Sequence, residues 1–433
     1  KIKIMGIFKL YDIRGKYNVD LTDEIIFKIG LAIGKFFSED NTIGILRDVR
    51  IHSERIRNIL VSALTHTHNI LDFGKGSTPE ANYLARVYSI PILVITASHN
   101  PKDYNGIKII NNRGFELFPE EIKKIEEIYK EVKVPSERVG IVEEEPSAIE
   151  IYKWYLYKKF RDIKGYRIGY DPSNSVMSLF KDILLDLGNE VYAINDKLDG
   201  NFPAHPPDPS VDENMKQMVE LVRNKKLDLG VVFDGDGDRI GFVDRNGRIV
   251  KPYEYLLAFI KEKRKFLLEI SLPIFLREYI KNKKADFIIS RTGRPFIIKK
   301  CMENNVFLAA EISCHYYFYE NFYSSDSLFA LLRLLRELKK NNLSLEDLKA
   351  PEFYYELLSL EKNKNIIDIL KKYFENKEIK IEDLNGELDG LEFIGNQFRI
   401  LVRESQTEPL YRIVLESYNN MDINEIKKLI IEG

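Results

Sequence analysis

The sequence predicts three α/β units followed by a smaller α+β unit. The chain has 433 residues, which at about 100–200 residues per domain is enough for several domains. Strand-like and helix-like segments alternate along most of the chain, which is typical of α/β layers. The last part instead has two strand candidates around a polar loop and a closing helix. The expected domains are residues 1–145, 146–247, 248–349 and 350–433.

The first unit contains short apolar runs that suit strands and longer segments with helical periodicity. The expected strands are Thr42–Leu46, Ile90–Thr96 and Ile107–Ile110, and the expected helices are Ser53–Leu64 and Pro119–Val132. The alternation restarts after an acidic stretch that contains proline, Glu143–Pro146. This restart marks the boundary of the second unit.

The second unit repeats the pattern and ends in a hairpin. Its expected strands are Tyr166–Tyr170, Glu190–Ile194, Leu229–Phe233 and Ile240–Val243, and its expected helices are Ser178–Leu187 and Glu213–Lys225. Asn246-Gly247 after the last of these strands is a strong hairpin signal, because both residues accept positive φ.

The third and fourth units differ from each other in the order of their elements. In the third, the expected helices are Tyr253–Lys263 and Ser327–Lys340, and the expected strands are Phe287–Ser290 and Val306–Ala310. In the fourth, strands at Phe398–Val402 and Tyr411–Leu415 precede a helix at Ile423–Ile431.

Composition excludes several classes of function. The 65 basic and 67 acidic residues give a net charge of −2, whereas nucleic-acid binding usually needs a basic excess. No apolar run reaches the ~18 residues of a membrane span, and Lys1–Met5 lacks the apolar core of a signal peptide. The two cysteines, Cys301 and Cys314, fit no zinc-ligand spacing. We therefore expect a cytoplasmic protein with no nucleic-acid or membrane partner.

Three carboxylates alternate with glycines directly after the apolar strand candidate Leu229–Phe233. Asp234, Asp236 and Asp238 can converge, since alternate side chains of extended backbone share a face. Such an all-oxygen set suits Mg²⁺, and three carboxylates this close would repel without a cation. We expect this loop to face solvent. The alternative is a solvated acidic turn, and the spacing of an EF-hand is absent.

Thr96-Ala97-Ser98-His99-Asn100-Pro101 follows another apolar strand candidate, where α/β sheets carry ligands. Ser98 is a candidate nucleophile there. In extended backbone the side chains of Ser98 and His99 would point apart, and Gly-x-Ser-x-Gly is missing, so a Ser–His–Asp hydrolase is disfavoured. The alternative is an ordinary polar turn.

Two further segments carry candidate functional groups. Lys108 lies in an apolar run, where partial desolvation would make it a base; the alternative is an edge-strand lysine. Arg403–Pro409, between two strands, offers an arginine fork, hydroxyls and amides for a phosphate; the alternative is a polar loop. Dinucleotide and nucleotide-phosphate glycine motifs are absent.

These residues, in this order, resemble the α-D-phosphohexomutase family over nearly the whole chain. The resemblance is carried by Tyr11-Asp12-Ile13-Arg14-Gly15, Arg47-Asp48-Val49-Arg50, Thr96–Pro101, Asp103–Lys108, Asp199–Pro203, Pro207-Asp208-Pro209, Asp234–Arg239, Glu311-Ile312-Ser313 and Arg403–Pro409. Several motifs in the family's order are far more specific than any one of them.

The resemblance implies three similar, mixed-sheet α/β domains and a smaller fourth domain around a central cleft. It also implies phosphoryl transfer between the 1- and 6-positions of a hexose, through a phosphoserine and a bisphosphorylated sugar. The implied ligands are a small-molecule sugar phosphate, Mg²⁺ and a hexose bisphosphate that acts as activator and intermediate. An oligomer is left open.

By position, Ser98 would be the phosphoserine and would bind the metal together with Asp234, Asp236 and Asp238. The other implied roles fall into three groups. The acid–base and phosphoryl-contacting groups would be His99, Lys108, Arg14 and Arg239. The sugar contacts would be Tyr11, Glu311, Ser313 and His315, and the contacts to the distal phosphate would be Arg403, Ser405, Gln406 and Thr407.

Within the family the sequence resembles the phosphomannomutase/phosphoglucomutase branch, with departures at the sugar loop. Ala310 and Cys314 replace two glycines, and Cys314 would then occupy a position that needs unusual dihedrals. Ser271 and Arg294 stand where the branch has a lysine and a histidine. The alternatives are a phosphoglucosamine mutase, a haloacid-dehalogenase-type phosphatase with Asp234 as nucleophile, and a non-catalytic sugar-phosphate-binding protein.

Overall fold

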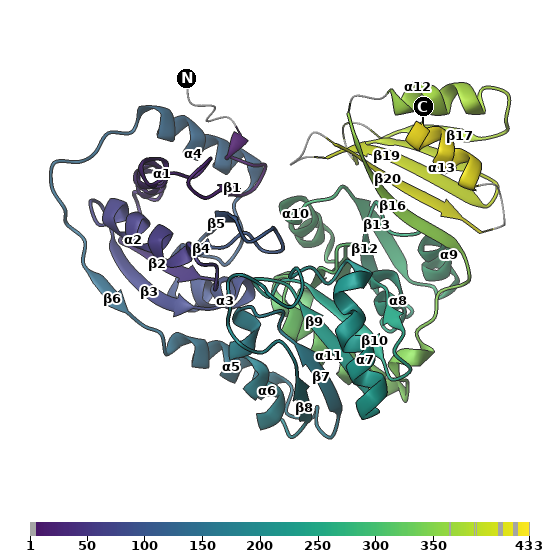
Figure 1. Cartoon of the computed structure of the whole chain (residues 1–433), viewed down its shortest axis with the longest axis horizontal. Helices are drawn as coiled ribbons and strands as arrows, with labels where there is room; N and C mark the ends of the chain where they lie inside the picture. Colours follow the sequence, from purple (N-terminus) through teal and green to yellow (C-terminus); the bar gives the residue numbers. More distant parts are fainter. Residues whose placement is uncertain are drawn as a thin grey trace. The chain divides into compact units, whose positions relative to one another are not determined.

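The structure is a computed structural model that describes residues 6–362, 365–384, 386, 388–405, 410–418 and 423–432. The chain forms two compact units. The first combines Lys1–Ala258 with Ser313–Leu348, and the second combines Phe259–Ile312 with Lys349–Gly433. Figure 1 shows the order of helices and strands along the chain.

The first sheet has six strands in the order β1-β5-β4-β2-β3-β6. Its strands are β1 Ile13–Lys16, β2 Thr42–Arg47, β3 Asn69–Lys75, β4 Ile92–Ile95, β5 Tyr104–Ile110 and β6 Val142–Glu144. Its helices are α1 Asp23–Phe36, α2 Ser53–Leu64, α3 Thr78–Tyr88 and α4 Pro119–Glu131. The pairs β4–β2, β2–β3 and β3–β6 are parallel, and β5 is antiparallel to β1 and β4, so the sheet is mixed.

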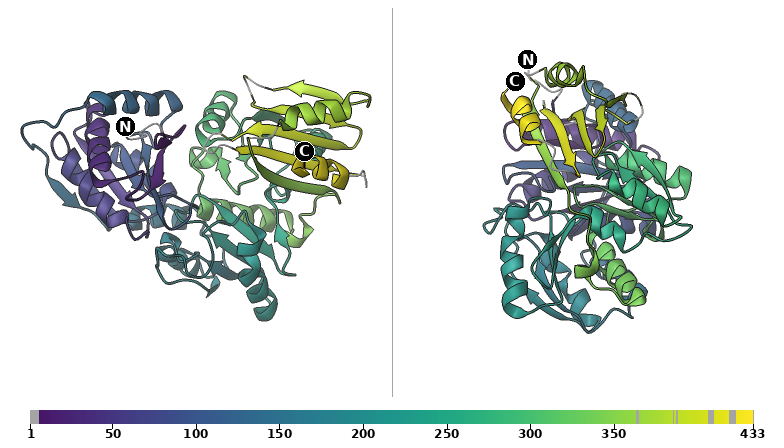
Figure 2. Two further views of the ribbon diagram at one scale, coloured as in Figure 1. Left: turned by 45° about the horizontal axis from the view of Figure 1, so that its top comes forward. Right: turned by 90° about the vertical axis from the view of Figure 1, so that its right-hand side faces the viewer.

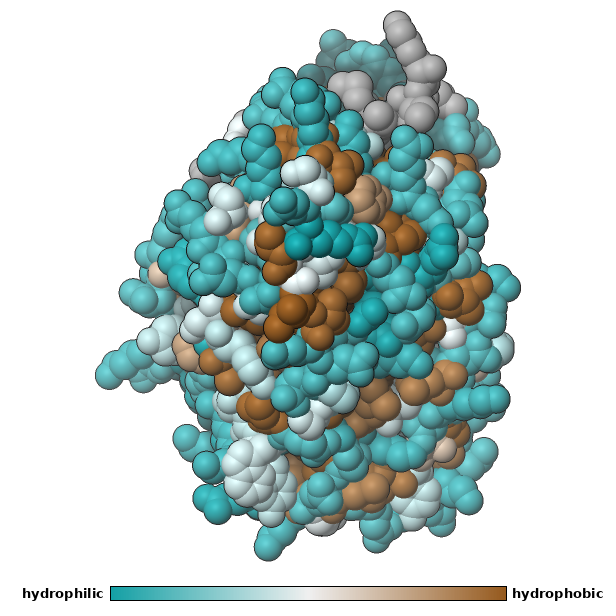
Figure 3. All heavy atoms as spheres, turned by 90° about the vertical axis from the view of Figure 1, so that its left-hand side faces the viewer, coloured by the Kyte–Doolittle hydropathy of each residue, from teal (hydrophilic) through white to brown (hydrophobic). Residues whose placement is uncertain are grey.

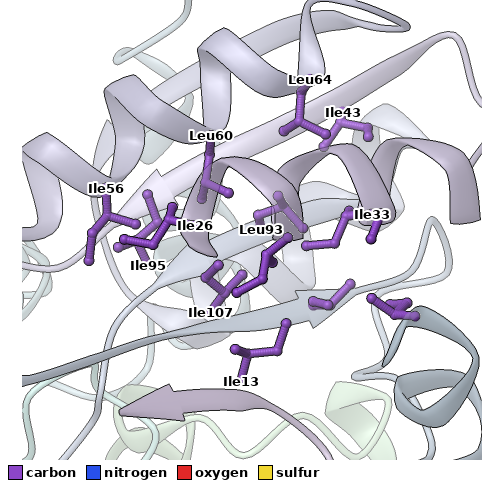
Figure 4. Packing of buried hydrophobic residues seen from close by; sticks show 14 of the residues in the cluster. Ile13, Ile26, Ile33, Ile43, Ile56, Leu60, Leu64, Leu93, Ile95 and Ile107 are labelled. Carbon is purple, nitrogen blue, oxygen red and sulfur yellow. The ribbon is translucent and has the colours of Figure 1, made fainter. Parts of the chain in front are cut away.

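Apolar side chains cover both faces of this sheet. On one face, Leu93 and Ile95 of β4 pack with side chains of α1 and α2 (Figure 4). On the other face, Ile92 and Val94 pack with Leu84 of α3. This alternation follows from the two-residue period of a strand, and burial on both faces fixes the end of β4, where Thr96–Pro101 begins.

The second sheet has five strands in the order β11-β10-β9-β7-β8. Its strands are β7 Arg167–Asp171, β8 Glu190–Ala193, β9 Leu229–Phe233, β10 Ile240–Asp244 and β11 Ile249–Val250. The helices of this section are α5 Ala148–Lys159, α6 Lys181–Asp186 and α7 Lys216–Lys225, with 3₁₀ turns at Val176–Leu179 and Asp212–Met215. The predicted hairpin is confirmed, because β10 and β11 pair antiparallel around Asn246-Gly247. The helix predicted at Ser178–Leu187 is instead a 3₁₀ turn followed by the short α6.

The remainder of the first unit contains α8 Pro252–Leu257, β15 Tyr316–Phe318, α11 Ser327–Asn341 and 3₁₀ turns at Tyr319–Asn321 and Leu345–Asp347. The predicted helix Tyr253–Lys263 was too long. Lys263 has a φ of +64°, which a right-handed helix does not accept, and a strand follows at once.

The second unit begins with parallel strands in the order β13, β12, β14. These strands are β12 Lys265–Glu269, β13 Asp286–Ser290 and β14 Leu308–Ala310, with helices α9 Phe275–Asn282 and α10 Arg294–Asn304. Phe287–Ser290 is thus confirmed as a strand, and Val306–Ala310 is one from Leu308 onward.

The C-terminal sheet is antiparallel, in the order β16-β20-β19-β18-β17. Its elements are β16 Tyr354–Glu361, β17 Lys380–Asp383, β18 Leu391–Gly395, β19 Phe398–Glu404, β20 Leu410–Ser417, α12 Ile366–Phe374 and α13 Ile423–Glu432. Both helices lie on one face of the sheet (Figure 2). Their apolar side chains belong to one cluster with those of the sheet. This arrangement confirms the predicted α+β unit.

One face of the molecule is drawn by hydropathy in Figure 3. On the face drawn in Figure 3, hydrophilic side chains predominate and hydrophobic ones form small separate groups. Among the described residues, no helix is both long and apolar enough to cross a membrane.

Candidate active site

Ser98 lies in the segment that joins β4 to β5, and its side chain is buried. The hydroxyl donates a hydrogen bond to Asp234 Oδ2 at 2.8 Å, and the backbone N–H donates to Thr96 Oγ1 at 2.9 Å. The φ of Ser98 is +50°, in the left-handed region that residues other than glycine seldom adopt. Strain of this kind concentrates at functional sites.

His99 lies closer to Ser98 than the sequence predicted. Its Nδ1 is 3.3 Å from the Ser98 hydroxyl oxygen, so the expectation that the two side chains point apart is wrong. The reason is the positive φ of Ser98, which ends the alternation of an extended strand. Burial, together with the positive charges of Arg239 and Arg14, lowers the pKa of His99 well below its ordinary value. The ring is therefore neutral at neutral pH.

The three aspartates of the segment after β9 meet as predicted. Ligand oxygens of Asp234, Asp236 and Asp238 all lie within 4.8 Å of one another. Burial and the neighbouring carboxylates of Asp238 and Asp236 raise the pKa of Asp234 well above its ordinary value. Asp236 Oδ1 is buried and has no hydrogen-bond donor among the described residues. Three buried carboxylates that lie this close together, one of them with an oxygen that lacks a donor, fit a cation, so this cluster can hold a metal ion.

The acidic loop is not solvent-facing, contrary to the expectation from the sequence. All three aspartates are buried, at 0%, 0% and 1% exposure. The hydroxyl and N–H of Thr78, at the start of α3, donate to the Asp236 carboxylate and carbonyl. Ser325 Oγ donates to Asp238 O at 2.6 Å, and Ser327 Oγ donates to Gly237 O at 2.6 Å. Contacts this distant in sequence are what bury the loop.

Thr78 is a residue of the site that the sequence argument missed. A local signal for its helix did exist, because Ser77 and Glu80 form a capping box with Pro79 between them. The pairing of Thr78 with Asp236, 158 positions away, has no signal in a single sequence.

Lys108 is an interior residue of the first sheet, since β5 lies between β1 and β4. The edge-strand alternative is therefore wrong. Its Nζ donates to Asp236 Oδ2 at 2.5 Å and to Asp238 Oδ2 at 2.7 Å. Although burial and Asp238 act in the opposite direction, Lys108 and Thr78 hold the pKa of Asp236 below its ordinary value. The structure thus brings Lys108 to the acidic cluster.

Two arginines flank the serine and the aspartates. Arg14 of β1 donates to Asn100 Oδ1 at 2.7 Å and to Asp12 Oδ2 at 2.6 Å. Arg239 donates from Nε to His315 Nε2 at 3.1 Å, and its NH1 lies 3.7 Å from Asp208 Oδ1. Although burial acts in the opposite direction, Asp208 and Asp234 raise the pKa of Arg239. These side-chain contacts hold both guanidinium groups in position.

Of the remaining sugar-contact candidates in the first unit, His315 contacts Arg239. Ser313 is half-buried in a turn, and His315 Nδ1 lies 2.9 Å from Ser325 Oγ. Cys314 has a φ of +71°, so this position does require the left-handed region, as expected from the glycine it replaces. Tyr11 is half-buried in the segment before β1.

In the second unit, Glu311 is buried directly after β14, and Gly293 N donates to its Oε1 at 3.5 Å. Ala310 ends β14 and is buried. Ser271 is buried and donates to Glu269 Oε1 at 2.9 Å, and Arg294 is the first residue of α10. The hydroxyl of Ser271 is therefore paired with Glu269, the last residue of β12.

Arg403 belongs to the end of β19, and Ser405 follows it, with its N–H donating to Leu410 O at 2.8 Å. The two flanking strands are confirmed, but Arg403 lies within β19 and not in the predicted loop Arg403–Pro409. Arg403 lies directly opposite Arg412 of β20. Gln406 and Thr407 lie outside the described residues.

Comparisons with known proteins give the family. The sequence matches the descriptions "Phosphoglucomutase/phosphomannomutase, alpha/beta/alpha domain I", "domain II" and "domain III" at residues 5–135, 151–247 and 254–354. A phosphomannomutase of Methanocaldococcus jannaschii is 32% identical over 98% of this chain and 97% of its own. A phosphoglucosamine/phosphogalactosamine mutase of Sulfurisphaera tokodaii is 30% identical over 97% and 98%.

Among solved structures, a phosphoglucomutase/phosphomannomutase family protein of Burkholderia thailandensis has a TM-score of 0.86 and 25% identity. The match covers 100% of this chain and 97% of that one. Fold and site therefore define an enzyme of the mutase class, an intramolecular phosphotransferase. The chain belongs to the phosphoglucomutase/phosphomannomutase family, the α-D-phosphohexomutases. Neither the dehalogenase-type phosphatase nor the non-catalytic alternative is supported.

Proposed function

We propose that the enzyme interconverts hexose 1-phosphate and hexose 6-phosphate, of mannose, glucose or both, through a phosphoserine at Ser98 and a bisphosphorylated sugar. The observation that carries this proposal is the 2.8 Å hydrogen bond from Ser98 Oγ to Asp234, one of three grouped carboxylates. A relative named phosphomannomutase over nearly the full length supports the choice of sugar.

The proposed metal is Mg²⁺, held by Asp234, Asp236 and Asp238 together with an oxygen on Ser98. A bound Mg²⁺ would neutralise charge on the phosphoryl group as it is transferred. Arg14 and Arg239 would hold the same phosphoryl group, because each guanidinium is already oriented by partners.

In the first transfer, the bond between phosphorus and Ser98 Oγ breaks while a bond forms to the free hydroxyl of the sugar phosphate. The hydroxyl proton passes to a base, for which neutral His99 is one candidate. Lys108 is the other; its ammonium donates to Asp236 and Asp238, so it must first release a proton to one of these carboxylates. The bisphosphorylated sugar then turns end for end. In the second transfer its other phosphoryl group returns to Ser98 Oγ, and the proton returns to the sugar oxygen.

The remaining roles concern binding. Tyr11, Glu311, Ser313 and His315 are proposed to contact sugar hydroxyls, and Arg403, Ser405, Gln406 and Thr407 are proposed to hold the phosphate that does not react. We retain the four domain bounds predicted from the sequence and a cytoplasmic location as proposals, with a small-molecule sugar phosphate as ligand and the oligomeric state left open.

A second candidate function is that of a phosphoglucosamine mutase. It is favoured by relatives such as the 31% identical phosphoglucosamine mutase of Dictyoglomus turgidum. Turnover of glucose, mannose, glucosamine and galactosamine 1-phosphates by the same preparation distinguishes the two functions.

The central test is Ser98→Ala, with Ser62→Ala on α2 as matched control. We expect acid-stable labelling of the parent and the control by labelled hexose 1,6-bisphosphate, and none of Ser98→Ala. Turnover of Ser98→Ala should fall by several orders of magnitude, since nucleophilic catalysis is lost. Near-normal turnover by Ser98→Ala, or full activity of the parent in excess chelator, would contradict the proposal.

A further inference from the structure

The backbone around Ser98 is strained, and a buried arginine holds it in place. Ser98 keeps a φ of +50° although it carries a side chain, and such a conformation persists only where the surroundings impose it. Arg50, which follows β2, has a side chain that is 0% exposed. Hydrogen bonds from its guanidinium group to the Ser98 turn, and not apolar packing alone, hold this side chain in place.

Arg50 donates hydrogen bonds to four carbonyl oxygens around the Ser98 turn. Its NH2 donates to Ser98 O at 2.8 Å and to Asn100 O at 2.7 Å. Its NH1 donates to Pro101 O at 2.7 Å and to Tyr104 O at 3.1 Å. A planar fork with several fixed donors can satisfy such a set at once, whereas a lysine ammonium cannot reproduce its geometry.

Asp48 links this arginine to the other side of Ser98. Its Oδ2 lies 3.2 Å from Arg50 Nε and accepts a hydrogen bond from Thr96 Oγ1 at 2.7 Å. Thr96 Oγ1 in turn accepts the N–H of Ser98 at 2.9 Å. The amide and the carbonyl of Ser98 are therefore both tied, through Thr96 and Arg50, to one carboxylate.

The loop that follows β8 covers the arginine. The ring centroid of Phe202 lies 5.1 Å from Arg50 Cζ, a cation–π distance. A Cβ added to Gly200 would lie 2.3 Å from Val49 O and 2.7 Å from Arg50 Cα, so only glycine permits this approach. The contact keeps water away from Arg50, which strengthens its hydrogen bonds.

We propose that Arg50, with Asp48 and Thr96, forms a positioning network that sets the backbone of Ser98 and so aims its hydroxyl at the acidic loop. None of the three contacts the carboxylates of Asp234, Asp236 or Asp238 in a hydrogen bond among the described residues. The network thus holds the backbone of the serine turn and makes no hydrogen bond to the carboxylates of the acidic loop. It gives a role to Arg47–Arg50 and Asp199–Pro203, two segments without an assigned chemistry. This inference rests on the proposed role of Ser98 as phosphoryl carrier.

The test distinguishes the effect of the hydrogen bonds of the Thr96 hydroxyl from the effect of the size of the side chain. Thr96→Val keeps the shape and removes both hydrogen bonds, Thr96→Ser keeps the hydroxyl, and Arg50→Lys keeps the charge without the fork. Arg55→Lys, at an exposed arginine of α2, is the control. The measurement is the single-turnover rate of Ser98 phosphorylation by labelled hexose 1,6-bisphosphate, alongside KM, Mg²⁺ affinity and thermal unfolding.

For Thr96→Val and Arg50→Lys we expect the phosphorylation rate and kcat to fall on the order of 100-fold, because a displacement of about 1 Å suffices for that loss. KM should stay near the parent's value, and Mg²⁺ affinity should fall no further than it does in Ser98→Ala. Thr96→Ser and Arg55→Lys should behave like the parent. If Arg50→Lys does not fold, the comparison of Thr96→Val with Thr96→Ser is sufficient to test the inference.

Two outcomes would overturn the inference while leaving the proposed function intact. One is a parental phosphorylation rate in Thr96→Val. The other is a rate that falls only in step with thermal stability, together with a raised KM and a Mg²⁺ affinity below that of Ser98→Ala, which would indicate a general folding role. By contrast, an unphosphorylated but fully active parent would refute the role of Ser98 itself.

Discussion

The α-carbon of Gly235 faces the carbonyl oxygen of Ser98 so closely that a Cβ on Gly235 would lie 2.2 Å from that oxygen. Real contacts of a Cβ are never this short, so only glycine lets the acidic loop reach the serine turn. The close approach sets the 2.8 Å hydrogen bond between Ser98 and Asp234. Gly235 therefore allows the acidic loop and the serine turn to lie in contact.

Gly235→Ala should separate the serine from the metal-binding carboxylates. We expect kcat to fall by on the order of 100-fold, since about 1 Å of separation is needed to relieve the contact. Mg²⁺ affinity should fall as well. Gly6→Ala is the matched control, because a Cβ there meets nothing within 4 Å. Equal kinetics of both variants would show that the two segments can move apart without cost.

Glu80 should make the stability of α3 depend on pH. Its side chain is fully buried, and burial raises its pKa to about 8, although the N–H of Ser77 acts in the opposite direction. The folded pKa lies above the ordinary value of 4.5, so the contribution to stability is complete below pH 4.5 and is lost as pH rises through about 8.

Glu80→Gln keeps the acceptor oxygen of the capping box and removes the ionisation. At pH 9 this variant should be more stable than the parent by several kcal/mol, up to about 5 kcal/mol, and near pH 4.5 the difference should nearly vanish. Thermal unfolding at pH 4.5, 7 and 9 measures this. Glu121→Gln, in the more exposed capping box of α4, is the control. The same pH dependence in parent and Glu80→Gln would contradict the prediction.

Elements with continuous apolar runs could be predicted from the sequence. Leu229–Phe233 is a strand with the predicted bounds, because five apolar or small residues end at the polar metal loop, and Ser53–Leu64 is a helix with the predicted bounds. β1 was missed, since its four residues, Ile13–Lys16, include two charged side chains and a glycine. Its strand conformation depends on pairing with β5, far away in the sequence.

At the site, the sequence predicted which side chains take part but not which residues contact them. The three aspartates converge because they alternate along a short segment, and this prediction was confirmed. The burial of Asp236 was not predicted, because it depends on Thr78. The approach of His99 to Ser98 depends on one positive φ, and no residue type at that position signals it.

Arg403 and Arg412 lie directly opposite each other in the C-terminal sheet. Like charges at such positions repel, so a bound anion would stabilise them. Arg403 Nε is buried and has no hydrogen-bond acceptor among the described residues. Both observations support a phosphate contact at this edge of the sheet.

Arg403→Ala should weaken binding of hexose phosphate by about 2–4 kcal/mol, or ~30- to 1000-fold, since a charge-assisted contact is lost. KM for hexose 1-phosphate should rise, and kcat should fall because the bisphosphate escapes more easily. Lys428→Ala, at an exposed lysine of α13, controls for loss of charge in this unit. Unaltered affinity for hexose 1-phosphate in Arg403→Ala would refute the assignment.

Cys314 combines a strained backbone with a buried side chain. Its φ of +71° costs a residue other than glycine about 1–2 kcal/mol. Its carbonyl accepts the N–H of Ile240, at the start of β10, and burial together with Asp208 raises the pKa of its thiol to about 12, so the thiol is uncharged. Any effect of Cys314 on the reaction is therefore one of shape or of backbone geometry.

We predict that Cys314 narrows the range of sugars by stiffening the segment that carries Glu311 and Ser313. Cys314→Gly removes both the strain and the side chain, whereas Cys314→Ala removes the thiol and keeps the strain. Glycine should broaden or accelerate turnover, by up to about 100-fold for the sugars that the parent handles poorly, because side chains must reach hydroxyls at hydrogen-bond distance. Alanine should resemble the parent, and Ser98 phosphorylation by hexose bisphosphate should be equal in all three proteins.

The measurement is kcat/KM for glucose, mannose and glucosamine 1-phosphates. A change shared by glycine and alanine would assign the effect to the thiol's volume, and identical profiles would move the search for sugar preference to Ser271 and Arg294.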